Sequence, residues 1–493
     1  MFPEAHETTI DGVPAFWTEI DESPQVTMTF GVGMRDEPPS LSGVTHLLEH
    51  LLFSSMEPSP LLANGATGPS VLRLTASGTP SELVDFVHAV TRAVRTLDAL
   101  PGAEVDREKR VLEAETTDHY AQPACTLLAH RFGYAGIGKS SGGTVALPLL
   151  TLDDVVSWAG THLTRDNLVL SFVGPPPEGI EIDLPSGVPA PRPVETDSVG
   201  VPTVVPSERH HLAFSIVTTP AMASHVACVL DHEILGDLRQ LDGLIYSTDT
   251  YLTDIDEGRT ALDVHLDPLP EQTIPALERL LAVLHRLRDD GVSREAVEYS
   301  LRSLRDASAD RASCGHQLLR ELAHSHVLGV PAHTPRAAAA MAQAVTPAAV
   351  TEALRGALGG LLIAVDDEQT VPETVTGPNG LAVRSLDLWV DSGAERPGPG
   401  AVRWRARRRG ALPGFRLALD ANCLWLSARG LEQRVPLDTL AFASHRGDGW
   451  IGLLDHDGRS AGIDMTDFRR GRDILDELAK RLPVGLVRAT PHP

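Results

Sequence analysis

The chain contains, near its N-terminal end, the apolar segment Gly43-Val44-Thr45-His46-Leu47-Leu48-Glu49-His50-Leu51-Leu52-Phe53. His46 and His50 are four residues apart, so on a helix both imidazoles project from one face, as two ligands of one zinc ion require. Glu49 lies on nearly the same face, where it is placed to accept a proton from a water rather than to bind the metal. The surrounding leucines indicate a buried helix, whereas two solvated histidines would be typical of a surface helix. We therefore predict a zinc site on this helix.

The chain length of 493 residues exceeds what one hydrophobic core accommodates and indicates about three domains. The contents of 42% hydrophobic and 22% charged residues are ordinary for a soluble globular protein. The net charge of -24 argues against nucleic acid or an anionic membrane as a main partner. Acidic side chains could line a chamber that attracts basic peptides, although a solvated, solubilising surface is the simpler explanation.

The chain start and the cysteines indicate the compartment. No basic region followed by an apolar core marks a secretory signal, and no apolar run is long enough to span a bilayer. Four cysteines are scattered without C-x-x-C spacing, at Cys125, Cys228, Cys314 and Cys423. This usage predicts reduced thiols in a cytoplasmic protein.

The segments on both sides of the motif make the pattern specific. An alternating run from Val26 to Gly33 predicts a strand with one buried face, and a polar, proline-rich loop follows it. The stretch from Gly31 to Pro39, followed by the motif from Gly43 to Phe53, resembles the opening of the pitrilysin/insulinase family of zinc peptidases. These are the inverzincins, in which H-x-x-E-H mirrors the commoner H-E-x-x-H. The resemblance implies a half-clamshell of two related α+β domains and zinc-dependent cleavage of peptides.

The family's third zinc ligand is a Glu on a later helix, in a pattern close to E-x-x-V-x-x-x-E. A helix predicted from about Glu104 to Tyr120 contains Glu108-Lys109-Arg110-Val111-Leu112-Glu113-Ala114-Glu115. The resemblance implies that Glu115 is the ligand and that Glu108, two turns back on the same face, supports the ligand shell. Glu113 is the nearest alternative, but it points away from that face. Without the family, ordinary exposed helix glutamates would explain the pattern.

The segment Asn64-Gly65-Ala66-Thr67 matches the family's N-A-x-T strand, with Gly65 in place of Ala. The resemblance implies an exposed sheet edge to which a substrate peptide adds as another strand, through main-chain hydrogen bonds. An internal strand is the alternative. The region from Ser54 to Ala63 is about ten residues shorter than is usual in the family, which would remove a helix and leaves the substrate specificity open.

The order of predicted elements repeats along the chain. Helices are predicted from Ser81 to Leu97, with Ser81 as the N-cap, and from Leu152 to His162, and a buried strand from Asn167 to Gly174 closes the first set. A linker rich in Pro, Gly and Glu follows at 175–207. The second set comprises a strand from Leu212 to Thr218, a helix from Ala223 to Leu235, helices through 270–310 and 335–356, and a strand from Gly360 to Val365. We therefore predict two related α+β domains, at 1–180 and 205–372.

The second repeat lacks the metal motif and contains a different one. H-x-x-E-H is not reproduced by its counterparts His225, Cys228, His232 and Glu233. The segment Leu238-Arg239-Gln240-Leu241-Asp242-Gly243-Leu244-Ile245-Tyr246 is similar to the family's L-R-x-x-x-G-L-x-Y, whose Arg and Tyr reach the zinc site of a facing half. The resemblance therefore implies that Arg239 and Tyr246 stabilise the oxyanion of the substrate carbonyl. It also implies two facing chains, as a homodimer or as a heterodimer with a related subunit.

The C-terminal part departs from the family. After a second predicted linker at 373–400, a small domain at 400–493 is predicted to hold strands and a final helix, which resembles a pleckstrin-homology-like fold. Its predicted elements are strands from Phe415 to Ser427, Arg434 to Ser444 and Trp450 to Asp455, and a helix from Arg472 to Leu482. The basic run from Arg403 to Arg409 could bind an anionic partner, although a solvated edge strand protected by charge is the commoner case.

The sequence thus predicts an α+β zinc metalloendopeptidase whose Zn²⁺ is held by His46, His50 and Glu115, with Glu49 as the general base. Its substrates would be peptides or unfolded segments that enter a closed chamber. The alternative is a non-catalytic peptide-binding or structural subunit, whose usual sign, a damaged motif, is missing from this sequence. A maturation peptidase that recruits a precursor peptide through the C-terminal domain would refine the first hypothesis.

Overall fold

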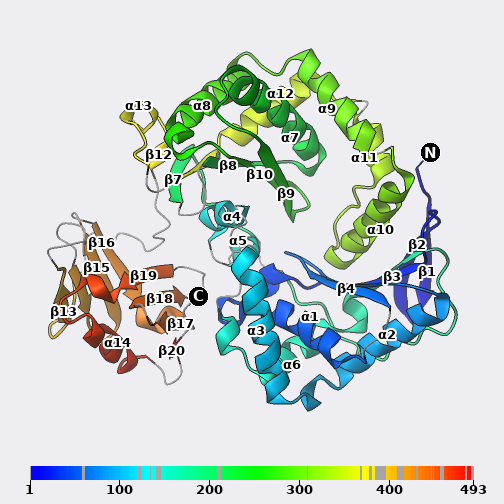
Figure 1. Cartoon of the computed structure of the whole chain (residues 1–493), viewed down its shortest axis with the longest axis horizontal. Coiled ribbons are helices and arrows are strands. Elements are labelled where there is room, and N and C mark those ends of the chain that lie inside the picture. The colour runs from blue at the N-terminus through cyan, green and yellow to red at the C-terminus, as the bar shows by residue number, and fades with distance from the viewer. Residues whose placement is uncertain are drawn as a thin grey trace.

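The computed structural model contains two six-stranded sheets followed by a pair of four-stranded sheets (Figure 1). It describes residues 2–57, 61–119, 124–133, 135–139, 146–192, 194–207, 212–307, 309–342, 344–366, 369–376, 380–383, 396–407, 416–428, 431–445, 447, 449–455, 460–482 and 486–489. Tyr120, Arg408, Arg409 and Phe415, which belong to predicted elements, lie outside the described residues.

The first sheet has the strand order β1-β2-β6-β3-β5-β4. Its strands are β1 (Ala5–Ile10), β2 (Val13–Thr18), β3 (Gln25–Phe30), β4 (Leu62–Thr67), β5 (Leu72–Ser77) and β6 (Leu168–Val173). One face is covered by helices α1 (Val44–Ser55), α2 (Pro80–Arg95), α3 (Gly102–His119) and α6 (Leu152–His162) (Figure 1). Alternation places Leu72 and Leu74 of β5 in the core beneath these helices, where they contact the leucines of α1. The predicted N-cap Ser81 is wrong, because Thr79 caps α2 in a capping box with Glu82.

The second sheet repeats this arrangement with the order β12-β7-β11-β8-β10-β9. Its strands are β7 (Thr203–Ser207), β8 (Leu212–Thr218), β9 (Thr248–Asp256), β10 (Arg259–Leu266), β11 (Leu362–Asp366) and β12 (Ala382–Val383). Strands β11 and β7 are parallel, as β6 and β2 are in the first sheet. The next pair in each sheet is antiparallel, β11 with β8 in the second sheet and β6 with β3 in the first. Parts of the two predicted linkers therefore belong to this sheet. The linker at 175–207 contains β7, the linker at 373–400 contains β12, and these two strands pair with each other.

The helices of the second repeat cover one face of its sheet (Figure 1). They are α7 (Pro220–Ile234), a π-helix (Leu235–Leu241), α8 (Thr273–Asp289), α9 (Arg294–Ala307) and α12 (Pro347–Leu358). Helix α11 (Pro335–Ala342) lies apart from this sheet, beside the helix that precedes it in the chain. The chain between α9 and α11, for which the sequence predicted no element, forms the long helix α10 (Arg311–Leu328).

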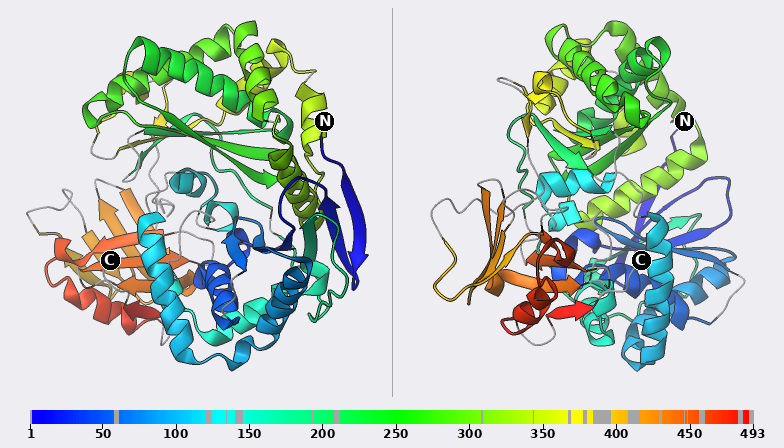
Figure 2. Two further views of the ribbon diagram at one scale, coloured as in Figure 1. Left: turned by 45° about the vertical axis from the view of Figure 1, so that its right-hand side comes forward. Right: turned by 60° about the vertical axis from the view of Figure 1, so that its left-hand side comes forward.

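Helix α10 packs on the first sheet rather than the second (Figure 2). Leu319 and Ala323 of α10 contact Phe16, Val169 and Val173, on the face opposite α1. Gly315 permits this approach, because a Cβ at that position would lie 2.6 Å from the side chain of Ile20. A helix contributed by the second repeat thereby joins the two domains by apolar packing.

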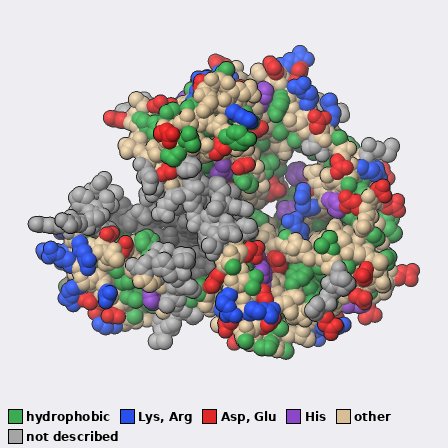
Figure 3. Space-filling model, viewed as in Figure 1, with side chains coloured by type: hydrophobic (Ala, Val, Ile, Leu, Met, Phe, Trp, Pro, Cys, Tyr) green, Lys and Arg blue, Asp and Glu red, His purple; other side chains and the backbone are tan. Residues whose placement is uncertain are grey.

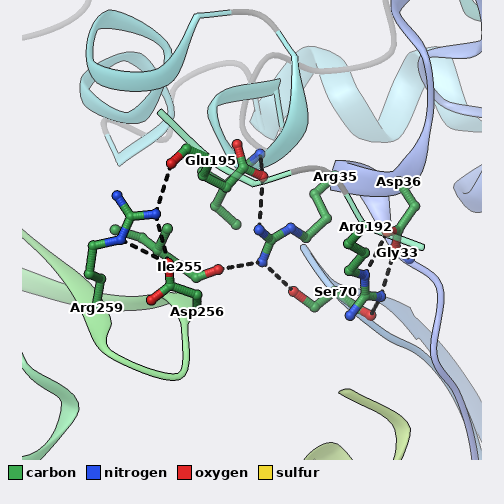
Figure 4. A network of polar contacts seen from close by, with 10 residues as sticks. Gly33, Arg35, Asp36, Ser70, Arg192, Glu195, Ile255, Asp256 and Arg259 are labelled. Atoms are coloured by element: carbon green, nitrogen blue, oxygen red, sulfur yellow. Dashed lines mark hydrogen bonds and ion pairs between the residues drawn. The ribbon is translucent and has the colours of Figure 1, made fainter. Parts of the chain in front are cut away.

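A buried polar network also joins the domains, beside the cavity that the C-terminal part of α10 lines (Figure 4). Arg35, which is 8% exposed, donates to the carboxylate of Glu195 at 2.8 Å and to the carbonyl of Ile255 at 3.0 Å. Arg259 of the second domain donates to the carbonyl of Glu195 at 2.8 Å. Because both arginines bind the same linker residue, removing Glu195 would leave a buried guanidinium without its counter-ion.

Short helices connect the second sheet to the first domain. Arg131 lies on α4 (Ala124–Phe132), is fully buried, and donates to the carbonyls of Ser215 and Gly360 at 2.8 and 2.9 Å. Its charge is matched by Asp197 at 2.7 Å. Asp263 on β10 lies directly opposite Ser215 and is also fully buried, which raises its pKa to about 6 despite the positive charge of Arg131.

We expect this buried carboxyl to make the protein less stable as pH rises from 4 to 6. The folded pKa is about 6 and the ordinary value is 3.8, so between them the folded protein holds a proton that the unfolded chain has lost. The stabilisation is complete below pH 4 and is lost above pH 6, in total about 3 kcal/mol. Asp263→Asn should flatten this decline in urea unfolding measured from pH 4 to 8, whereas Asp249→Asn, at an exposed site on β9, should keep it. An unchanged decline in Asp263→Asn would contradict the assignment.

The C-terminal sheets have the orders β13-β14-β15-β16 and β19-β18-β17-β20. The strands are β13 (Val402–Arg405), β14 (Arg416–Leu419), β15 (Cys423–Ala428), β16 (Leu431–Pro436), β17 (Leu440–His445), β18 (Trp450–Asp455), β19 (Ser460–Asp464) and β20 (Val487–Ala489). They share one core with α14 (Arg472–Ala479), and the predicted strand from Arg434 to Ser444 is in fact two strands. No helix within the described ranges is long and apolar enough to cross a membrane. Cys228, Cys314 and Cys423 are free thiols.

Candidate metal and peptide site

The N-terminus of α1 is held by a buried carboxylate. Glu37 accepts hydrogen bonds from the backbone N–H groups of Gly43 and Thr45, both at 2.9 Å, where the helix dipole favours negative charge. Lys139, on the short helix α5 (Gly136–Lys139), donates to the same carboxylate at 2.7 Å, and both side chains are buried. Gly43 precedes the helix with φ +96°, which a residue with a Cβ rarely adopts. This contact sets the position of the helix that carries the histidines.

Three of the predicted site residues lie together between α1 and α3. Glu115 Oε2 is 3.3 Å from His50 Nε2, and Glu115 Oε1 is 3.8 Å from His46 Nε2. Ligands of a tetrahedral zinc ion are about 3.4 Å apart when each lies about 2.1 Å from the metal. The donor set of two imidazoles and one carboxylate, all within 4.8 Å of one another, therefore fits zinc, and the 39% exposed side chain of Glu115 leaves an approach from solvent.

Glu108 lies behind the histidines. Its Oε2 is 3.3 Å from His50 Nδ1, the nitrogen on the far side of the ring from Glu115. Its other oxygen accepts from Arg107 at 2.8 Å. A carboxylate at Nδ1 favours the tautomer whose Nε2 lone pair is free, so Glu108 orients His50 toward a metal.

Glu49 is hydrogen-bonded to the edge strand β4 and lies close enough to His50 and Glu115 for their charges to act on it. Its Oε2 accepts from the hydroxyl of Thr67 at 2.6 Å, and a Cβ on Gly65 would lie 2.3 Å from its Oε1. Burial raises the pKa of Glu49, and the hydrogen bond from Thr67 and the charge of His50 offset part of that effect. The departure from the family pattern, Gly65 in place of Ala, is thus explained by the space that the Glu49 side chain occupies.

Strand β4, which contains Asn64, Gly65, Ala66 and Thr67, is the last strand of its sheet. It pairs with β5 on one side only, so its other edge has main-chain groups that face away from the sheet. Leu62 at its start is 78% exposed. The edge lies beside Glu49, which allows an added peptide strand to pass next to the Glu49 carboxylate.

Arg239 and Tyr246 lie together, but on the second domain. The Arg239 guanidinium carbon is 5.0 Å from the centre of the Tyr246 ring, and Tyr246 is 74% exposed. Their neighbours Leu238 and Ile245 are buried in the second core, whereas α1 is part of the first. Among the described residues, no hydrogen bond or ion pair connects this pair to the His46 group.

Comparisons with known proteins find the fold but no related sequence. No protein-family model matches the chain, and no curated protein sequence matches it. Among solved structures, a protease from Helicobacter pylori superimposes with a TM-score of 0.60 at 13% identity, over 74% of this chain and 99% of that one. A peptidase M16 inactive domain from Pseudomonas fluorescens gives a TM-score of 0.60 at 15% identity, over 74% of this chain and 98% of that one.

A chain of a larger assembly also has a similar fold. A chain of complex III2 from Candida albicans matches with a TM-score of 0.63 at 16% identity, over 74% of this chain and 97% of its own length. The predicted α+β half-clamshell is therefore confirmed as a fold. These neighbours include a protease, an inactive domain and a subunit of a complex, so the likeness alone leaves open which of these roles this chain has.

The sequence did not identify three residues that are important for the geometry. Arg35 and Glu37 lie in a segment predicted as a polar loop, and Lys139 lies in a segment for which no element was predicted. Glu37 and Lys139 hold the start of α1, and Arg35 joins the domains. A signal for Glu37 was present, since a carboxylate a few residues before a helix is typical of an N-terminal cap. No comparable signal identified Lys139, which is 102 residues away in sequence.

Proposed function

We propose that this protein is a zinc-dependent endopeptidase that hydrolyses peptides or unfolded polypeptide segments. The observation that carries the proposal is the convergence of the His46, His50 and Glu115 donor atoms within 4.8 Å, with Glu49 directed at a free sheet edge. Bound zinc would lower the pKa of a water and polarise the scissile carbonyl.

The residues of the chain would divide the remaining work. The edge of β4 aligns the peptide as an added strand through main-chain hydrogen bonds. Glu49 accepts the proton of the attacking water and passes it to the leaving amine. His50 is kept in the ligand tautomer by Glu108.

The Arg239 and Tyr246 pair would act on the site of a second chain. Its separation from the His46 group within one chain and the high exposure of Tyr246 support this arrangement. An exposed aromatic ring stacked on a guanidinium is typical of a contact surface. We propose a homodimer with two composite sites, or a heterodimer with a related subunit.

The second candidate function is a non-catalytic peptide-binding or structural subunit. The likeness to an inactive M16 domain and to a chain of complex III2 supports it. The two proposals differ in metal content, because a supporting subunit has no need of a complete ligand set.

Metal removal tests the proposal directly. We expect the purified full chain to contain about one zinc per protein, to hydrolyse a mixed peptide pool, and to lose hydrolysis on treatment with a chelator. Added zinc should restore hydrolysis, and magnesium, which prefers octahedral oxygen ligands, should not. Zinc content is measured by atomic absorption and hydrolysis by mass spectrometry of the pool. A protein that binds no zinc and hydrolyses no peptide would instead support the non-catalytic subunit. Hydrolysis that survives chelation would contradict the zinc-dependent mechanism.

A further inference from the structure

A cavity of about 220 Å³ lies on the face of the first sheet opposite α1, beneath α10. Its floor consists of hydroxyl and amide side chains of β3 and β5, and two arginines, Arg73 of β5 and Arg320 of α10, line it together with His316 and His324. No Asp or Glu belongs to the described lining. Figure 3 shows basic and histidine side chains gathered in the hollow between the two domains. This local charge is opposite to the net charge of -24.

Arg73 has no counter-ion in the described part of the chain. It is half-buried, and among the described residues neither its side chain nor that of Arg320 makes a hydrogen bond or ion pair. Burial lowers the pKa of Arg73, and the positive charge of Arg320 lowers it further, with no carboxylate acting in the opposite direction. Glu321, the acidic neighbour of Arg320, interacts with the charge of Arg320 but lines a different cavity, so Arg73 is the arginine without a carboxylate partner. Every other well-buried arginine discussed above, Arg35 and Arg131, is paired with a carboxylate.

A half-buried guanidinium whose charged neighbour is a second guanidinium destabilises the fold unless an anion neutralises it. Two arginines supply forked donors that fit a carboxylate or a phosphate, and Thr27 and Thr75 in the same lining supply hydroxyl donors. Desolvation lowers the pKa of His324, and the positive charges of Arg192, Arg73 and Arg320 lower it further, with only Asp254 opposing. The chemistry of the cavity is therefore that of an anion site.

The register of the sheet connects this cavity to the peptide edge. Ala66 of β4 lies directly opposite Arg73, so their side chains share one face of the sheet. A peptide added to β4 would place every second side chain on that face, about 10 Å from β5. Ala66, the β4 residue in register with Arg73, has only a methyl side chain, so a long acidic side chain of the peptide and the long arginine side chain could meet above it. The described lining of the cavity itself contains no residue of β4.

We propose that Arg73 and Arg320 form a subsite that binds a carboxylate side chain of the peptide lying along β4, and thereby select substrates with an acidic residue near the scissile bond. The proposal rests on the proposed function in one respect, which is that the peptide binds at the β4 edge. Such a subsite favours peptides with an acidic side chain, whereas the net charge of the chain by itself would attract basic peptides.

The test uses the zinc-loaded full chain and pairs of fluorogenic peptides that differ only by Glu or Gln at one position on either side of the cleaved bond. At one position, kcat/KM for the Glu peptide is expected to exceed that for the Gln peptide by about tenfold or more. Arg73→Gln should bring this ratio close to one. Arg92→Gln, the same change at an exposed position of α2, should keep the wild-type ratio. Equal rates for both peptides at every position in the wild type would overturn the proposal.

Binding measurements separate this proposal from the proposed function. If no peptide is cleaved, the proposed function fails, and fluorescence anisotropy of the same labelled pairs still tests the subsite, with the Glu peptide expected to bind about tenfold tighter in an Arg73-dependent way. Inorganic phosphate should compete with the Glu peptide. An Arg73-dependent thermal stabilisation by phosphate, combined with equal affinities for the Glu and Gln peptides, would mean a free anion and overturn the peptide assignment.

The stability of the variant provides a further check on Arg73. Because its charge is uncompensated, Arg73→Gln should melt at the same temperature as the wild type or higher in phosphate-free buffer. A lower melting temperature would show that Arg73 supports the fold, and would overturn the proposal.

Discussion

Glu49→Gln is expected to lower kcat/KM for peptide hydrolysis by about a thousandfold or more while the protein keeps its zinc. The amide of Gln has nearly the shape of the carboxylate and can still accept the hydrogen bond from Thr67, so the space beside Gly65 stays filled. It cannot accept a proton, and so both the activation of the water and the protonation of the leaving amine are lost. The metal ligands His46, His50 and Glu115 are unchanged, so zinc content should be equal in both proteins.

The control for this variant is Glu298→Gln, the same substitution at an exposed position of α9 in the second domain. It should hydrolyse the peptide pool at the wild-type rate. Equal cleavage by Glu49→Gln and wild type would show that another group moves the proton, and loss of zinc from Glu49→Gln would show that Glu49 is a ligand rather than a base.

A mixture of Glu49→Gln and Tyr246→Phe chains is expected to recover activity that neither variant has alone. Tyr246→Phe removes one hydroxyl donor to the oxyanion, which should reduce kcat by about a hundredfold or more. In a homodimer with shared sites, half of the dimers in an equal mixture are mixed, and each has one intact site of two. An equal mixture should therefore recover about one quarter of the wild-type activity, and purified mixed dimers about one half.

The measurement uses co-expression with two different tags, so that mixed dimers are purified as such. The matched control pairs Glu49→Gln with a double variant that combines Glu49→Gln and Tyr246→Phe. No intact site can form in that pair, and it should stay inactive. If the mixed dimers of the single variants are also inactive, sharing between two copies of this chain is wrong, and the partner must be a related subunit or absent.

Much of the fold could be predicted because its elements follow local periodicity. The helix α6 has the predicted bounds Leu152–His162, and α1 was expected from the apolar residues that surround His46. The duplication was predictable because the same order of elements occurs twice, and the two strand orders match. The spacing of four between His46 and His50 determines that both lie on one helix face, whatever surrounds the helix.

Long-range contacts could not be predicted in the same way. Helix α10 packs apolar residues on the first sheet, but no local sequence pattern predicts which of the two sheets a helix covers. The ion pair of Lys139 could not be predicted either, because its partner Glu37 lies on a distant segment of the chain. Nor could the lack of a counter-ion for Arg73, because that depends on the position of α10. Glu115 was chosen through family resemblance, since helix periodicity alone did not separate it from other glutamates of α3.

The sequence by itself determined the elements, the two-fold repetition of the α+β unit, and the helix face that carries His46, Glu49 and His50, because these depend on residues within a few turns of one another. Only the tertiary structure decided that Glu115 approaches the histidines, that Glu49 bonds Thr67 of β4, and that the Arg239 guanidinium lies over the ring of Tyr246. Those distances depend on how separate elements pack, and packing is set by the summed burial of both domains rather than by any one segment.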